Sequence, residues 1–519
     1  MQDIIVLRNN LSELSDAFVY IKNIIEESYG PLGKKVVMIE KETSPFSTND
    51  GYTILKNLRS EDKYVVIARN ILMNSASKIN TEVGDGTSTS ILLSANLISE
   101  FLKLLNSLYK TNQDPRLLQW VRDIDSIECQ ILALLKDKSI KSLTKDTIHK
   151  VAKTAVREEY LAKMVSEFIH KLGKNGMPTL AYDTKLEYEV YQNSFYIEGK
   201  LPKVDYFSDK VNLKTEIKNP LVILINASID DNNFPKLQNM VSSLAPLKRD
   251  IVLITQEQSD QFIRYCDKSL KQDVKVYPVL APHVAEKTNT TFGDMEVLLD
   301  CECINPGKGK PFDIFDRNTH LGKTDLVTLD KSKVIFSKIK PNKKSLKDRR
   351  EQVEILLKDR TMRGVHDFLI ERKTMLATRF GIFYVSGKTD METTDMYTRI
   401  EDGIRSCQSA MREGLLEGAG VPLYDISNNI ALYESSDHGK RIEEIFYNYC
   451  QYQSKLIHRH LQLDSEYDIE EIRKIVKGKV YDTYESVEKT IESSISLLKQ
   501  VLLTNIIMYD TDKDTSDQR

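Results

Sequence analysis

Cysteine and long apolar runs are scarce in this chain of 519 residues. Its 6 cysteines are scattered, which argues against a disulfide framework. The longest apolar runs, such as residues 221–225, fall far short of the roughly 18 residues of a membrane-spanning helix, so we expect no membrane association. The chain does not begin with a basic segment followed by an apolar stretch. A secretory signal is therefore not expected, and the predicted location is the cytoplasm.

A strong excess of charge of either sign is also lacking. The net charge of -3 gives no electrostatic reason to expect nucleic acid or an anionic membrane surface as a partner. Cys301 and Cys303 lie two residues apart and suggest a metal site, but no second pair of ligands follows nearby. Buried thiols on a strand are the better interpretation.

The chain does contain a clear change of pattern along its length. Helical periodicity dominates residues 11–29, 64–136, 147–173, 346–377 and most of the remainder to residue 508. From residue 176, strand-like runs alternate with helical stretches at 234–244 and 259–270, which is typical of an α/β unit. The length favours two to four domains. We therefore predict a multidomain α and α/β protein whose central α/β module interrupts a helical body; periodicity leaves open whether the two helical parts meet.

The segment Gly-Asp-Gly-Thr-Ser-Thr at residues 84–89 precedes an apolar helix. Glycines let backbone N–H groups approach a phosphate, and a helix start carries unpaired donors and a partial positive charge. The hydroxyl groups of residues 87–89 add donors, and the carboxylate of Asp85 suits Mg²⁺. An ordinary capped loop is the alternative, and this segment alone leaves both open.

Two further tight turns lie at residues 30–33 and 49–51. Either turn could contribute backbone to a phosphate site, although each is more often only a turn. A conventional P-loop is excluded, because the Gly-Lys-Thr triplets at 322–324 and 387–389 lack the glycine required five residues earlier. ATP would have to bind in another way.

Several motifs resemble GroEL-type (group I) chaperonins. SYGPLGKKVVMIEK at 28–41, STNDGYTI at 47–54 and VGDGTSTSILLSANLI at 83–98 match the three nucleotide-binding signatures in order and spacing. Residues 399–423, RIEDGIRSCQSAMREGLLEGAGVPL, resemble the RVEDAL segment and the glycine-rich turn after it. Residues 480–482, before a helix expected to reach Met508, resemble the last nucleotide-contacting region. The chain is identified by this resemblance as a divergent member, of the kind a virus-encoded copy would be.

The resemblance implies a chaperonin architecture of three domains. A mostly helical equatorial ATP-binding domain would comprise residues 1–134 and 411–519. A small intermediate hinge domain would comprise 135–190 and 380–410, and an α/β apical client-binding domain 191–379. The hinge positions would be Asn193, Gly381 and Gly414.

The resemblance also implies roles for single residues, with ATP and Mg²⁺ as cofactors and K⁺ as a candidate second ion. Asp85 would hold Mg²⁺, Asp402 would position the attacking water, and Asp50 would assist it. The nucleotide would be contacted by Ser28, Tyr29, Gly30, Pro31, Gly51, Gly86, Thr87, Ser88, Thr89, Ala419, Gly420 and Asp482. The alternative for Asp402 is a solvated helix aspartate. Two departures, Asn49 for a lysine and Ala419 for the central glycine of a turn, bear on nucleotide affinity and hydrolysis rate.

Clients would bind apolar side chains in the α/β region. The resemblance implies Tyr206, Phe207, Leu237, Val241, Phe262 and Ile263 for this surface. Packing of the same helices against a sheet is the competing explanation, because each helix must bury one face.

The predicted function is that of an ATPase that binds unfolded polypeptides in a ring cavity and assists their folding through ATP-driven domain movement. The ring would be a homo-oligomer, expected to be seven-fold, single or double, with the need for a co-chaperonin left open. If the chain is virus-encoded, its location would be the host cytoplasm. A ring-forming holdase with weak or no hydrolysis is the first alternative, and a monomeric small-molecule phosphotransferase is the second.

Overall fold

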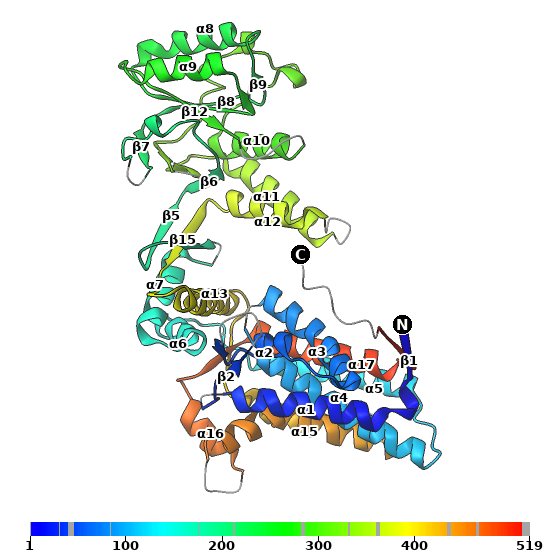
Figure 1. Cartoon of the computed structure of the whole chain (residues 1–519). Helices are drawn as coiled ribbons and strands as arrows, with labels where there is room; N and C mark the ends of the chain where they lie inside the picture. Colours follow the sequence, from blue (N-terminus) through cyan, green and yellow to red (C-terminus); the bar gives the residue numbers. More distant parts are fainter. Residues whose placement is uncertain are drawn as a thin grey trace. The chain divides into compact units, whose positions relative to one another are not determined.

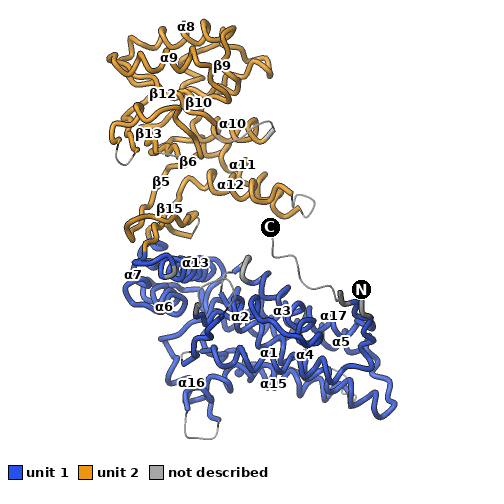
Figure 2. Tube along the Cα trace, viewed as in Figure 1, with its two compact units in different colours: residues 1–170, 387–519 blue, residues 171–386 orange. Residues whose placement is uncertain are grey.

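The computed structural model describes residues 2–30, 32–39, 46–83, 85–174, 176–210, 213–281, 286–330, 333–359, 364–432, 437–462 and 467–510. The chain divides into two compact units, each described here by itself (Figure 2). Unit 1 comprises residues 1–170 and 387–519, and unit 2 comprises residues 171–386.

Unit 1 is mostly helical (Figure 1). Its helix α1 forms where the sequence predicts it, because Leu14, Phe18 and Ile21 recur at helical spacing and are buried together. The helices are α1 (Leu11–Ser28), α2 (Gly51–Asn57), α3 (Lys63–Glu82), α4 (Thr87–Lys110), α5 (Leu117–Asp137), α6 (Lys145–Val156), α7 (Glu159–Leu172), α13 (Asp390–Glu413), α14 (Val421–Ser427), α15 (Asp437–His460), α16 (Ile469–Val476) and α17 (Tyr484–Leu502).

The two helical parts of the chain meet in unit 1. Helix α4 packs against α1 on one side and against α17, from the far end of the sequence, on another. Inside this contact the Ser94 hydroxyl donates to Ser494 over 3.0 Å. The unit is therefore discontinuous in sequence but shares one hydrophobic core.

Helix α4 is more apolar than the run lengths in the sequence indicated. By length and composition it could cross a membrane, and it is the one described helix that passes this test. Its apolar window is 67% buried inside the fold, which is what the central helix of a helical core requires.

Helices α6, α7 and α13 form a block within unit 1. Gly403 of α13 lies so close to α6 that an added Cβ would come within 2.5 Å of the Val156 side chain. The single helix predicted for residues 147–173 is wrong: the chain turns between α6 and α7, where Arg157 has a left-handed backbone with φ of 69°.

Short strands complete unit 1. They are β1 (Gln2–Val6), β2 (Val36–Met38), β3 (Phe46–Thr48), β16 (Leu415–Glu417), β17 (Tyr481–Thr483) and β18 (Ile506–Asp510). The pairs β1–β18, β2–β3 and β16–β17 are antiparallel. The helix expected to reach Met508 in fact ends at Leu502, because residues 506–510 pair with the N-terminal strand instead.

Unit 2 contains the α/β module predicted from the sequence. Its main layer is a parallel sheet in the order β12–β10–β8, with helices α8 and α9 between its strands in sequence. Two further sheets have the orders β6–β14–β13–β7 and β4–β15–β5, and β9 pairs with β11. The strands are β4 (Met177–Tyr182), β5 (Glu187–Gln192), β6 (Ser194–Glu198), β7 (Thr215–Lys218), β8 (Leu221–Leu224), β9 (Ser228–Ile229), β10 (Ile251–Thr255), β11 (Glu257–Gln258), β12 (Val276–Leu280), β13 (Leu326–Leu329), β14 (Lys333–Ser337) and β15 (Arg379–Val385).

The helices of unit 2 are α8 (Phe234–Leu244), α9 (Asp260–Ser269), α10 (Glu286–Leu299), α11 (Lys343–Lys358) and α12 (His366–Leu376). The buried carboxylate of Asp294 in α10 accepts from Arg349 and Arg372, each over 2.6 Å, and so joins three helices. Cys301 and Cys303 are buried as expected, but they lie in the segment after α10 and not on a strand.

The residues predicted as hinges differ in backbone conformation. Asn193 has φ of 48° and Gly414 has φ of 97°, both in the left-handed region that favours asparagine and glycine. Gly381 lies inside strand β15, opposite Val190 of β5. Their role as hinges and the three-domain boundaries stay predictions.

Candidate nucleotide-binding site

The turn at residues 49–51 lies directly against the start of helix α4. Asp50 caps α2, where its Oδ2 accepts from the Thr53 N–H over 2.8 Å, and its Oδ1 accepts from the Thr87 hydroxyl over 3.3 Å. The N–H of Gly51 donates to Ser88 Oγ over 3.0 Å. A Cβ on Gly51 would lie 2.6 Å from that oxygen, so the close approach of the two loops requires glycine.

Asp85 is the point where three distant segments converge. Its Oδ1 accepts from the Gly86 N–H over 2.7 Å, and its Oδ2 accepts from the Ser406 hydroxyl of α13 over 3.3 Å. Its backbone carbonyl accepts from the Ser486 hydroxyl of α17 over 3.1 Å. Gly86 has φ of 87°, a conformation that lets α4 start immediately after this contact.

The end of helix α1 joins the same loops. The hydroxyls of Tyr29 and Thr89 lie 3.0 Å apart, and Gln453 of α15 donates to the Tyr29 hydroxyl over 2.9 Å. A ring nitrogen of His460 lies 3.1 Å from the Tyr29 carbonyl. Ser28 is buried and its hydroxyl donates to the carbonyl of Ile25, so in this conformation the hydroxyl is hydrogen-bonded within α1.

Two predicted residues of this first turn remain. Gly30 has φ of 79°, and Pro31 lies outside the described residues. The hydrogen bonds of Tyr29 and Gly51 therefore connect the turns near residues 30, 50 and 85 in one place.

The glycine-rich turn of residues 418–420 closes another side. Strand β16 pairs with β17, which places Leu416 opposite Asp482. Ala419 has φ of 61°, an unusual conformation for alanine, and its side chain belongs to a small apolar cluster with α16. Gly420 has φ of 72° and lies against the side chain of Gln453.

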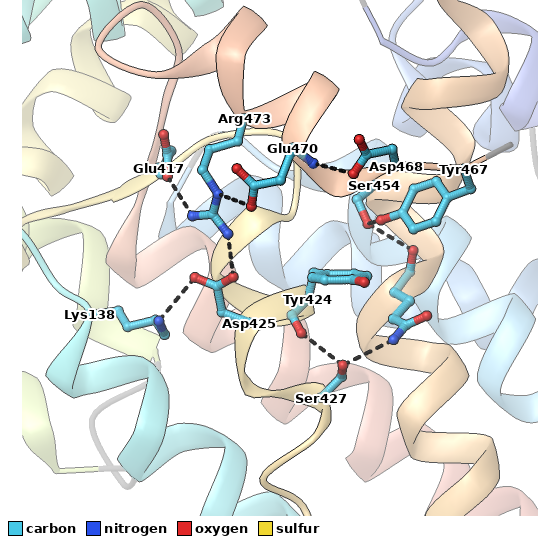
Figure 3. Close-up of polar contacts among 11 residues, drawn as sticks. Lys138, Glu417, Tyr424, Asp425, Ser427, Ser454, Tyr467, Asp468, Glu470 and Arg473 are labelled. Atoms are coloured by element: carbon cyan, nitrogen blue, oxygen red, sulfur yellow. Dashed lines mark hydrogen bonds and ion pairs between the residues drawn. The ribbon is translucent and has the colours of Figure 1, made fainter. Parts of the chain in front are cut away.

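A network of ion pairs braces this turn (Figure 3). Arg473 of α16 pairs with Asp425 of α14 over 2.7 Å and with Glu417 of β16 over 3.7 Å, and Lys138 reaches Asp425 over 3.0 Å. Burial would raise the pKa of Asp425, but the hydrogen bonds from Arg473 and Lys138 outweigh it and lower the pKa. The network ties α14, α16 and β16 together around residues 418–420.

Carboxylates dominate the electrostatics of the site. The pKa of Asp402 is raised to about 8, first by burial and then by the negative charges of Asp85 and Asp50. The pKa of Asp482 is raised to about 7 by burial and by Asp85. Burial also raises the pKa of Asp85, although hydrogen bonds from Gly86 and Ser406 oppose the shift. Such crowding favours the binding of cations.

The donor set fits a hard cation such as Mg²⁺. Within the described ranges no group of three or more His, Cys, Asp or Glu side chains could hold a metal ion by itself. Mg²⁺ commonly takes only one or two carboxylates and completes its shell with phosphate oxygens and water. Asp85, at the start of α4, provides such a carboxylate.

The site residues predicted in unit 1 are thus brought together, apart from the undescribed Pro31. The contributors that the sequence analysis missed include Gln453, Ser406 and Ser486. Ser406 lies four residues after Asp402 on the same helix, and Ser486 lies four residues after Asp482. Helical spacing from Asp402 could have found Ser406, whereas Asp482 lies in strand β17 and Ser486 in helix α17, so no single periodicity connects that pair.

The predicted client residues of unit 2 are placed differently. Tyr206, Phe207, Leu237, Val241 and Phe262 are all buried in the core of unit 2, and Ile263 is half-buried. These five side chains are therefore not exposed in this conformation, and their role in client binding stays a prediction. The physical reason is that α8 and α9 bury their apolar faces in the core that also contains the parallel sheet.

The outward faces of these helices are polar. The exposed residues include Lys236, Gln238 and Asn239 on α8 and Gln261 and Arg264 on α9. Asp267 of α9 accepts from the Tyr206 hydroxyl over 2.8 Å and pairs with Lys203 over 2.5 Å. It therefore anchors the 203–207 segment to α9.

Comparison with known proteins defines the class of protein. The profile of the TCP-1/cpn60 chaperonin family matches residues 21–298, more than half of the chain, and the chain belongs to this family. Chaperonin GroEL 1 of Corynebacterium efficiens is 22% identical over 424 residues, which are 81% of this chain and 77% of that protein.

Two solved structures have a similar fold along nearly the whole chain. Both are crystal forms of the chaperonin gp146 from bacteriophage EL of Pseudomonas aeruginosa in the presence of ATP-BeFx. The TM-scores are 0.66 and 0.58, with 18% sequence identity, and each alignment covers 98% of this chain and 99% of the other. The chain is a divergent chaperonin of GroEL type with a chaperonin fold.

Proposed function

We propose that this chaperonin binds ATP with Mg²⁺ at the site around Asp85 and couples hydrolysis to the folding of client polypeptides in a homo-oligomeric ring. The observation that carries the proposal is the convergence of Asp50, Asp85 and Asp402 in unit 1. The ATP analogue named for the phage EL structures supports the choice of nucleotide.

Each part of the site has a chemical task in this proposal. Asp85 would hold Mg²⁺, which neutralises phosphate charge when it is bound. The N–H groups at the start of α4 would donate to phosphate oxygens. Asp402, in its ionised form, would orient a water molecule, and Asp50 would support it. Because α13 carries Asp402 and also packs on α6, movement of this block would control when the carboxylate arrives.

Ring formation is supported by exposed apolar side chains on two small sheets. Ile4 of β1 and Met508 of β18 are paired in register and are 66% and 70% exposed. Val37 of β2 is 61% exposed and Ile39, which follows β2, is 79% exposed. Such residues are usually covered when subunits associate. A seven-fold ring, single or double, is the assembly we propose, and contact with a co-chaperonin is an outcome that assembly experiments will decide.

Phosphate release and electron microscopy of the full chain test the proposal. Asp402→Asn should lower the ATP turnover rate by about 100-fold or more, because the water is no longer oriented. Glu401→Gln is the matched control, since Glu401 pairs with Arg405 over 2.6 Å, and its rate should stay within a few-fold of wild type. Images should show rings for all three proteins.

The outcomes separate the alternatives. Rings without ATP turnover in the wild type would favour a holdase. Ala419 motivates this test, because it replaces a glycine at a left-handed position and so bears on nucleotide affinity and hydrolysis rate. A monomer that phosphorylates a small metabolite would overturn the chaperonin mechanism.

A further inference from the structure

Arg157 occupies the turn between helices α6 and α7. It ends α6 with φ of 69°, a left-handed conformation that is costly for a residue with a Cβ. Its N–H donates to the Lys153 carbonyl over 2.9 Å and so closes the last turn of the helix. The conformation turns the chain sharply and leaves the Arg157 side chain exposed.

The turn is tied to the helix that carries Asp402. Arg399 of α13 pairs with Glu158 over 2.7 Å and donates to the Val156 carbonyl over 3.4 Å. It therefore contacts the residues on both sides of Arg157. Gly403 packs against Val156 on the next turn of α13. Arg157 and Asp402 therefore belong to one packed block and would move together.

The guanidinium of Arg157 reaches the candidate nucleotide site. When the Asn49 amide is oriented with its oxygen toward Arg157, this oxygen accepts from both Nη1 and Nη2 of the guanidinium. The distance from Nη2 to the oxygen is 3.0 Å. Asn49 directly precedes Asp50, the cap of α2. The positive charge also lies close enough to Asp85 and Asp50 to interact with both carboxylates. Within the described part of the chain, Arg157 forms no ion pair with a carboxylate at contact distance.

We propose that Arg157 binds the γ-phosphate of ATP, with Asn49 orienting its guanidinium in the nucleotide-free state. The inference rests on the proposed ATP site. It adds a phosphate-binding residue that no motif in the sequence indicated.

Charge balance gives the physical reason. Asp50, Asp85, Asp402 and Asp482 place up to four negative charges around the site, and a triphosphate adds more. One Mg²⁺ supplies only two positive charges. A guanidinium that contacts an amide oxygen and has no carboxylate at contact distance can exchange that contact for phosphate oxygens, which suit its planar array of donors better. ADP lacks the γ-phosphate, so this contact would be specific for ATP.

Binding of ATP and ADP to the full chain, measured by calorimetry with Mg²⁺, tests the inference. Arg157→Gln should weaken ATP binding by about 10-fold to 100-fold, as expected for a charge-assisted hydrogen bond, and should change ADP binding by less than about 3-fold. Arg157→Lys should recover part of the loss. The matched control is Arg116→Gln, because Arg116 is also exposed and left-handed, with φ of 50°, but caps α5. It should change neither affinity.

A rescue variant separates a phosphate contact from a structural role. In Arg157→Gln, the additional change Asn49→Lys should restore ATP binding, since it returns a positive charge to the position that the guanidinium contacts. Equal weakening of ATP and ADP binding, or no weakening of either, would overturn the inference. If wild type binds neither nucleotide, the proposed ATP site itself is wrong, so the two failures are distinguishable.

Discussion

The residues predicted to form functional sites are placed differently in the polar loops of unit 1 and in the apolar helices of unit 2. In unit 1, turns far apart in sequence come together, and Asp50 accepts a hydrogen bond from Thr87 across 37 residues. In unit 2, the apolar residues expected to meet clients lie in the core, and Phe262 is completely buried. Glycines and carboxylates in tight turns have few purely structural reasons to gather, whereas an apolar stripe on a helix is explained by packing alone.

The largest expected effect tests the packing explanation in unit 2. Phe262→Ala should destabilise unit 2 by about 3–5 kcal/mol, because it removes a buried ring between α9 and its neighbours. Hydrogen exchange of residues 221–281 in the full chain, followed by mass spectrometry, measures the change. Gln261→Ala, exposed on the same helix, is the control and should stay within about 0.5 kcal/mol.

The packing explanation is contradicted if Phe262→Ala loses affinity for an unfolded client while its hydrogen-exchange protection equals that of wild type. A client contact, and not packing, would then be the role of Phe262.

A smaller effect is expected from crowding at the unit 1 loops. Gly51→Ala should destabilise unit 1 by about 1–3 kcal/mol, because the new methyl group would lie 2.6 Å from Ser88 Oγ and 2.9 Å from Ser88 Cα. ATP affinity should fall with it, and both are measured by thermal unfolding and calorimetry. Gly364→Ala is the control, since no atom lies within 4 Å of its added Cβ. Wild-type stability of Gly51→Ala would show that the two loops are not held together.

The smallest effect concerns pH. Asp402 and Asp482 have pKa values of about 8 and 7 in the fold, above the usual aspartate value, so the folded state binds protons more tightly than the unfolded state. Their contribution to stability is present below pH 4 and is lost as pH rises toward 8. The measurable consequence is a fall in Tm as the pH rises through this range.

Thermal unfolding of the nucleotide-free chain from pH 5 to pH 8.5 measures this loss. Asp402→Asn should flatten the pH dependence, and Mg²⁺ with ATP should reverse it, because cations stabilise the ionised carboxylates. A stability that rises with pH and is insensitive to Asp402→Asn would contradict the assigned electrostatics.

Much of the architecture could be predicted from local patterns. The α1 stripe of Leu14, Phe18 and Ile21, the α/β alternation of unit 2 and the glycine turns at 30, 51 and 86 follow from residue type and spacing. The break at Arg157 was missed because an arginine carries no signal for a left-handed backbone. Strand β18 was missed because residues 506–510 continue the apolar pattern of the preceding helix. They form a strand because they pair with β1, which is remote in sequence.

The amino-acid sequence by itself determined where the chain turns and which loops carry oxygen ligands, since glycine and aspartate act through short-range backbone geometry. Only the tertiary structure decided which side of α8 and α9 is buried, and that Gln453, Ser406 and Arg157 reach the same site. The reason is that burial and Coulomb interactions depend on distances between segments remote in sequence, and those distances exist only after the helices have packed.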